Sequence, residues 1–127
     1  MNTVALDTNI VIDILNGNEE IVCKFEKYLS LHLPVTVCGE LLFGATNSVN
    51  SKKNLTIYRG FILSCTILNI NSAIAEQYAL IRKKLKDKGT PIPENDIWIA
   101  ATCIVYEISL ATNDKHFKNI GGLTLIV

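Results

Sequence analysis

The sequence predicts an α/β fold in which helices cover both faces of a parallel sheet of about five strands. Short apolar segments alternate along the chain with longer segments whose apolar residues recur every three or four positions, the spacing of one helical face. The chain has 127 residues, the common size of one domain, so we expect a single domain over residues 1–127.

The first expected element is a strand over residues 3–6, which stops at Asp7. A helix follows, because the apolar residues between Ile10 and Leu15 share one face, and Asn16-Gly17-Asn18 closes it. The next expected elements are a helix over 19–31, a strand over the β-branched residues 35–37, a helix containing Glu40 and a helix over 55–63.

In the second half of the chain, a strand is expected over residues 66–70. Asn71 or Ser72 can cap the helix that follows, and Gly89 terminates it. The last expected elements are a central helix over 94–106 and strands over 109–111 and 123–126, with a turn-rich stretch over 112–122.

The composition limits the classes of protein to consider. Hydrophobic residues make up 49% of the chain and charged residues 19%, which is too apolar for disorder, and no apolar run is long enough for a membrane helix. The N-terminal segment lacks the features of an export signal, so we expect a cytoplasmic protein. Twelve basic and twelve acidic residues give a formal net charge of zero, so the chain as a whole does not attract polyanions. Any contact with a nucleic acid must therefore be made by a local group of basic residues.

Cysteine and histidine offer little reactive chemistry. The four cysteines are widely spaced among apolar neighbours, which is typical of buried small side chains rather than of disulfides or a zinc site. Only His32 and His116 are available for histidine chemistry. Carboxylates are therefore the abundant reactive groups.

Carboxylates follow several of the predicted strands. Asp7, Glu40 and Asp114 each come after a strand, and ligands of parallel sheets bind beyond the carboxyl ends of the strands. Asp96 falls in the first turn of a helix, and Asp7 or Asp114 alone would serve as a cap or turn residue. Together the four acids would repel one another unless a cation neutralised them, and oxygen ligands favour Mg²⁺ or Mn²⁺.

Four segments carry a resemblance to a known family. They are Leu6-Asp7-Thr8-Asn9, Gly39-Glu40-Leu41-Leu42-Phe43-Gly44-Ala45, Pro91-Ile92-Pro93-Glu94-Asn95-Asp96-Ile97-Trp98-Ile99-Ala100-Ala101 and Ala111-Thr112-Asn113-Asp114-Lys115-His116-Phe117. In order and spacing they resemble the PIN-domain ribonucleases of the VapC toxin type, over essentially the whole chain. The resemblance implies a PIN-like three-layer α/β/α sandwich around a parallel sheet.

The resemblance also implies an activity and its residues. It implies a metal-dependent endoribonuclease, the toxin of a type II toxin–antitoxin system, with Mg²⁺ or Mn²⁺ held by Asp7, Glu40, Asp96 and Asp114. Thr8, Asn9 and Thr112 match residues that orient these acids. The expected partners are an RNA substrate, a VapB-type antitoxin and a second copy of the chain. One departure is Val37, where many relatives carry Ser or Thr.

Basic residues next to the fourth acid can contact RNA. Lys115, His116 and Lys118 follow Asp114 closely and are able to bind phosphates, although a solvated turn explains them equally well.

Two other functions compete with this interpretation. An aspartate-nucleophile phosphatase needs a second acid two residues after the first, where this chain has Asn9. A non-catalytic or differently specific nucleic-acid-binding protein with a PIN fold is the remaining alternative.

Overall fold

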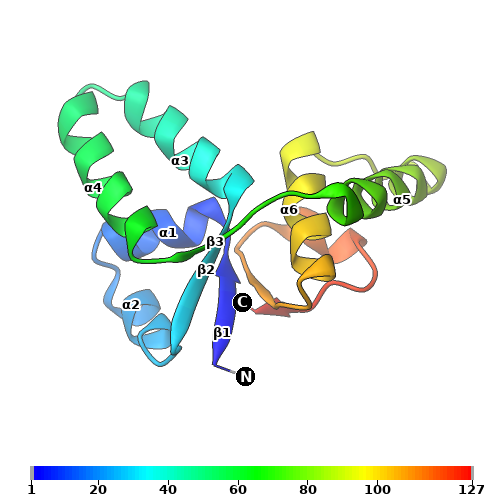
Figure 1. The fold of residues 1–127 in the computed structure, drawn as a ribbon, viewed down its shortest axis with the longest axis horizontal. Helices are drawn as coiled ribbons and strands as arrows, with labels where there is room; N and C mark the ends of the chain where they lie inside the picture. Colours follow the sequence, from blue (N-terminus) through cyan, green and yellow to red (C-terminus); the bar gives the residue numbers. More distant parts are fainter. Residues whose placement is uncertain (1, 127) are drawn as a thin grey trace.

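A computed structural model describes residues 2–126 and contains a five-stranded, fully parallel sheet with the order β3-β2-β1-β4-β5. Helices lie on both sides of the strands, with α1 and α2 on one side and α5 and α6 on the other (Figure 1). The predicted three-layer α/β/α architecture and its parallel sheet are confirmed.

The elements follow one another in the alternating order that a parallel sheet requires. Their bounds are β1 Thr3–Leu6, α1 Thr8–Leu15, α2 Glu19–Phe25, β2 Ser30–Pro34, α3 Val35–Thr46, α4 Ser51–Leu63, β3 Thr66–Leu68, α5 Ser72–Lys88, α6 Glu94–Val105, β4 Leu110–Ala111, the 3₁₀ helix η1 Lys115–Asn119 and β5 Leu125–Ile126.

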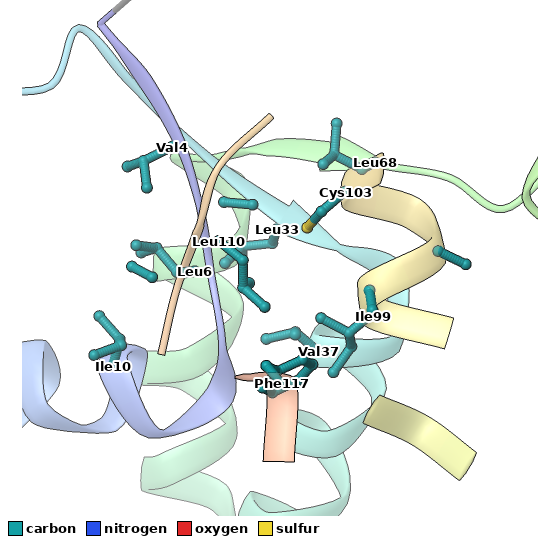
Figure 2. Close-up of a cluster of buried hydrophobic side chains, with 14 of the residues drawn as sticks. Val4, Leu6, Ile10, Leu33, Val37, Leu68, Ile99, Cys103, Leu110 and Phe117 are labelled. Carbon is teal, nitrogen blue, oxygen red and sulfur yellow. The ribbon is translucent and has the colours of Figure 1, made fainter. Parts of the chain in front are cut away.

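The hydrophobic core lies between the sheet and its helices. Val4 and Leu6 of β1 are fully buried, and Leu33 of β2 and Leu110 of β4 extend the same cluster (Figure 2). Because helices cover both faces of the sheet (Figure 1), Val4, Ala5 and Leu6 of β1 are all apolar and buried, without alternation. This buried strand ends at Leu6, and the chain leaves the core at Asp7.

The adjoining ends of β1 and β4 set the position of the acidic residues. Leu6 pairs with Ala111, and the Asp7 backbone N–H donates to the Ala111 carbonyl over 2.9 Å. The residues that follow the two strands therefore start from neighbouring points on one edge of the sheet.

The second strand was placed wrongly from the sequence. The predicted strand over 35–37 is the first turn of α3, and the observed strand β2 lies just before it, where the end of a helix was expected. Leu31 and Leu33 alternate with polar neighbours along β2, and Val37 is buried as part of a helical face instead. Burial against the core outweighs the weak strand preference of β-branched residues.

Other boundaries differ from the predictions by a few residues. Helix α2 ends at Phe25 rather than at residue 31, α4 begins at Ser51 rather than at residue 55, and the turn-rich segment contains η1. Cys23 is exposed rather than buried, whereas Cys38 and Cys103 are buried as predicted. None of the helices described within residues 2–126 is long and apolar enough to cross a membrane.

Candidate metal centre

The four acids predicted from the sequence meet at the carboxyl edge of the sheet. Asp7 follows β1, Asp114 lies three residues beyond β4, and Glu40 and Asp96 come from α3 and α6. Their charges interact, because repulsion from Asp114, Asp7 and Glu40 raises the pKa of Asp96. The chain brings its candidate ligands together from widely separated segments.

Asp7 lies at the centre of this group and has only 4% of its surface exposed. It caps α1, because its Oδ1 accepts the Thr8 backbone N–H over 2.8 Å. Its Oδ2 accepts from the Thr112 hydroxyl over 2.6 Å and from the Asn9 side-chain amide over 3.0 Å. These hydrogen bonds fix the orientation of the carboxylate.

Glu40 reaches the edge from the second turn of α3 rather than from the end of a strand. Its Oε1 accepts the Thr8 hydroxyl over 3.0 Å, which links it to the start of α1. Thr8 therefore contacts two of the acids, Asp7 through its backbone and Glu40 through its side chain.

Asp114 is held by β4 and by η1. The Thr112 hydroxyl that donates to Asp7 also accepts the Asp114 backbone N–H over 2.9 Å. The Asp114 carboxylate in turn caps η1 by accepting the His116 backbone N–H over 2.9 Å. Thr112 thus connects the first and fourth acids, in the supporting position that the sequence predicted for it.

Asp96 lies in the first turn of α6, where the helix dipole favours an anion. Its side chain is 12% exposed and lies 3.6 Å from the Nδ1 atom of His116, which also lies 3.0 Å from Oδ1 of Asp114. His116 is therefore a direct neighbour of two acids, and not simply an exposed basic residue of a turn.

Three of the acids, Asp7, Glu40 and Asp96, have raised pKa values in the folded chain. Burial raises the pKa of Asp96 to about 6, and repulsion from Asp114, Asp7 and Glu40 adds to this effect. Burial also raises the pKa values of Asp7 and Glu40, although their hydrogen bonds partly offset it. A divalent cation would relieve the desolvation and the repulsion together, so the residues present fit a metal centre.

The remaining predicted residues lie beside the acids. Lys115 and Lys118 are exposed on η1, outside the acid group itself.

Sequence reasoning missed polar contacts around the site. The Asn113 backbone N–H donates to Oδ1 of Asn9 over 3.1 Å, and the Asn113 side chain donates to Asp13 over 3.3 Å. The amide of Asn95 favours the ionised form of Glu40. Asn95 and Asn113 each stand next to a predicted acid, and this adjacency was the one signal for them in the sequence.

The chain is similar to known proteins over most of its length. The family model of the PIN domain matches residues 4–123. Among characterised proteins, the tRNA(fMet)-specific endonuclease VapC of Salmonella typhimurium is 31% identical, and the match covers 94% of this chain and 93% of that protein.

Solved structures with the same fold include VapBC complexes. The DNA-bound VapBC of Salmonella typhimurium matches with a TM-score of 0.91 and 28% identity, over 99% of this chain and 98% of that chain. VapBC2 of Rickettsia felis, bound to a DNA fragment from its promoter, matches with a TM-score of 0.90 and 27% identity, over 98% and 97%.

Proposed function

The chain belongs to the PIN domain family of VapC-type ribonucleases, and on this premise we propose that it is a metal-dependent endoribonuclease, the toxin of a type II toxin–antitoxin system. The observation that carries the proposal is the convergence of Asp7, Glu40, Asp96 and Asp114 at one edge of the sheet. The active unit in this proposal is a single PIN domain formed by residues 1–127.

In this proposal the four carboxylates hold Mg²⁺ or Mn²⁺, the hard ions that oxygen ligands select. Such an ion would lower the pKa of a water molecule bound to it and would stabilise the negative charge that develops on the leaving oxygen. Thr8, Asn9 and Thr112 keep the carboxylates oriented through the hydrogen bonds described above. Lys115 and Lys118 are placed to bind phosphates of the RNA, each with a modest, salt-sensitive effect.

The hydrolysis needs no side chain as nucleophile. Water forms the new bond to phosphorus, the bond from phosphorus to one ribose oxygen breaks, and that oxygen takes up a proton. The neighbouring 2′-hydroxyl does not attack, so the products carry linear phosphates. This separates the proposed reaction from metal-free RNA cleavage through a 2′,3′-cyclic phosphate.

The test is cleavage of RNA by the purified full-length chain with and without divalent metal. We expect cleavage with added Mg²⁺ or Mn²⁺, a loss of at least about a hundredfold after chelation, and recovery when the metal is returned. Analysis of the RNA ends should find linear phosphates. Cleavage that survives chelation, or that leaves cyclic phosphates, would contradict the proposal.

A non-catalytic nucleic-acid-binding PIN protein remains the alternative. Such a protein would also bind nucleic acid at this edge of the sheet, but it would not require a divalent ion at the four acids. Calorimetric titration with Mg²⁺ distinguishes the two, because binding that disappears in a carboxylate variant is expected for the nuclease alone.

We further propose a VapB-type antitoxin and a second copy of the chain as partners, acting in the cytoplasm where the RNA substrate occurs. The structures of VapBC complexes with this fold support the antitoxin. Exposed apolar side chains offer surface for protein contacts: Phe43 and Leu63 on α3 and α4, and Leu80 and Tyr106 at α5 and the end of α6. Light scattering of the free chain should give twice its 14.0 kDa mass, and a monomer mass would remove the dimer.

A further inference from the structure

His116 lies against the candidate metal centre in a way that phosphate binding does not explain. Its Nδ1 atom is 3.0 Å from Oδ1 of Asp114 and 3.6 Å from Oδ2 of Asp96. The ligand atoms of the three residues all lie within 4.8 Å of one another. The His116 side chain thus contacts two of the candidate metal ligands directly.

The spacing of these atoms suits shared coordination. Around an ion with bonds of about 2.1 Å in octahedral geometry, neighbouring ligand atoms lie about 3.0 Å apart. The contact between His116 and Asp114 already has this separation, and the contact with Asp96 exceeds it slightly. The imidazole therefore needs little rearrangement to become a ligand beside the two carboxylates.

The backbone holds the imidazole at this place. The Asp114 carboxylate accepts the His116 backbone N–H over 2.9 Å, and the next residue, Phe117, is fully buried. The backbone on both sides of the His116 side chain is thus anchored, although the ring itself is about half exposed. Exposure on one side leaves room for solvent or substrate at the remaining coordination positions.

We propose that His116 is a nitrogen ligand of the metal ion, beside Asp96 and Asp114, and that it gives the site a preference for Mn²⁺ over Mg²⁺. This inference rests on the proposed metal centre. Imidazole nitrogen binds first-row transition ions such as Mn²⁺ more strongly than it binds Mg²⁺, which demands oxygen ligands. A site of carboxylates alone lacks this source of discrimination.

The test measures metal binding by the free full-length chain, without RNA. His116→Asn replaces the ring nitrogen with an amide group at a similar distance from the backbone, so an oxygen ligand for hard ions remains available. Asn119→Ala is the matched control, because it removes another exposed polar side chain of the same short helix. Calorimetric titrations with Mn²⁺ and Mg²⁺ give the affinity ratio for each protein.

We expect His116→Asn to weaken Mn²⁺ binding by about tenfold or more and to change Mg²⁺ binding by less than about threefold. Pulsed electron paramagnetic resonance of bound Mn²⁺ should show coupling to a directly bonded nitrogen in the native chain. That coupling should persist in Asn119→Ala and disappear in His116→Asn.

Three results would overturn the inference, and they separate it from the proposed function. If the native chain and His116→Asn have the same ratio of Mn²⁺ affinity to Mg²⁺ affinity, and the native chain shows no nitrogen coupling, His116 is excluded as a ligand. The carboxylate centre would remain in place. Tighter binding of both ions by His116→Asn would mean that the imidazole is a counter-ion displaced by metal. If the native chain binds neither ion, both His116 as a ligand and the carboxylate metal centre are contradicted. If it binds Mn²⁺ with nitrogen coupling but does not cleave RNA, only the proposed nuclease activity is contradicted.

Discussion

Asp96→Asn is expected to abolish RNA cleavage and to leave the fold intact. The substitution removes one charge from a group in which Asp114, Asp7 and Glu40 all repel Asp96. Loss of a metal ligand removes several kcal/mol of transition-state stabilisation, so cleavage should fall by at least about a thousandfold. The amide has nearly the same shape as the carboxylate, and packing around α6 should not change.

The matched control for this variant is Asp87→Asn. Asp87 lies on α5, where its side chain is 58% exposed and pairs with Lys83 on the surface. The same chemical change there should leave cleavage and metal affinity at the native level, because exposed ion pairs contribute little. Unfolded Asp96→Asn protein, or undiminished cleavage by it, would argue against Asp96 as a ligand.

The melting temperature of the metal-free protein provides an independent check on Asp96. Its pKa is raised from 3.8 to about 6 in the folded chain, mainly by burial, so the folded state holds this proton more tightly than the unfolded state. The resulting stability is fully present below the ordinary pKa and is lost as pH rises through about 6. Asp7 and Glu40 contribute in the same direction.

The native chain without metal should therefore melt at a lower temperature at about pH 7.5 than at about pH 5. Asp96→Asn lacks the raised pKa, so its melting temperature should depend less on pH and should equal or exceed the native value at the higher pH. If native and variant melting temperatures change in parallel between the two pH values, the ionisation of Asp96 is not the cause of the pH dependence.

Local signals in the sequence predicted most elements of the fold. Helix α5 begins after Asn71, whose side chain accepts the Ile74 backbone N–H, and ends at Gly89, which has the left-handed φ of 70°. Strand β1 and helix α1 are separated by Asp7, which was expected to cap the helix and does so. These boundaries depend on a few adjacent residues, so one sequence is enough to find them.

The region of β2 and α3 depends on distant contacts instead. Strand β2 pairs with β1 and β3, and neither pairing is visible in its own residues. The helix that follows begins with Val35, Thr36 and Val37, which prefer strands as isolated residues. The packing of Val37 into the core decides between the two structures, and local preference cannot represent it.

The difference between local signals and distant contacts also explains which parts of the candidate site could be predicted. The four acids stand in motifs that together resemble a known family, although each acid alone has a structural explanation, and Thr112 was expected beside them. The approach of His116 to Asp96 depends on η1, which the sequence indicated as an irregular turn. A contact between α6 and η1 needs the three-dimensional arrangement of both.

Phe117→Ala is expected to cause the largest loss of stability among substitutions near the site. Phe117 is fully buried although its neighbours in η1 are exposed, and it lies in the same core cluster as Val37 and Ile99 (Figure 2). Removing a buried phenylalanine ring costs about 3 to 5 kcal/mol, because the lost contacts leave a cavity. The melting temperature should fall by about 10 to 20 °C, as measured by thermal denaturation.

Loss of the Phe117 ring should also weaken metal binding at the candidate site. Asp114 and His116 lie just before Phe117, and Phe117 is the buried residue of η1, so its ring anchors this short helix to the core. We therefore expect weaker Mn²⁺ binding by Phe117→Ala even at temperatures where the variant stays folded. Phe43→Ala is the matched control, since Phe43 is 70% exposed on α3 and its loss should change stability by less than about 0.5 kcal/mol. Equal stability of the two variants would mean that η1 is not anchored through Phe117, and unchanged Mn²⁺ affinity in folded Phe117→Ala would mean that Asp114 and His116 keep their positions without it.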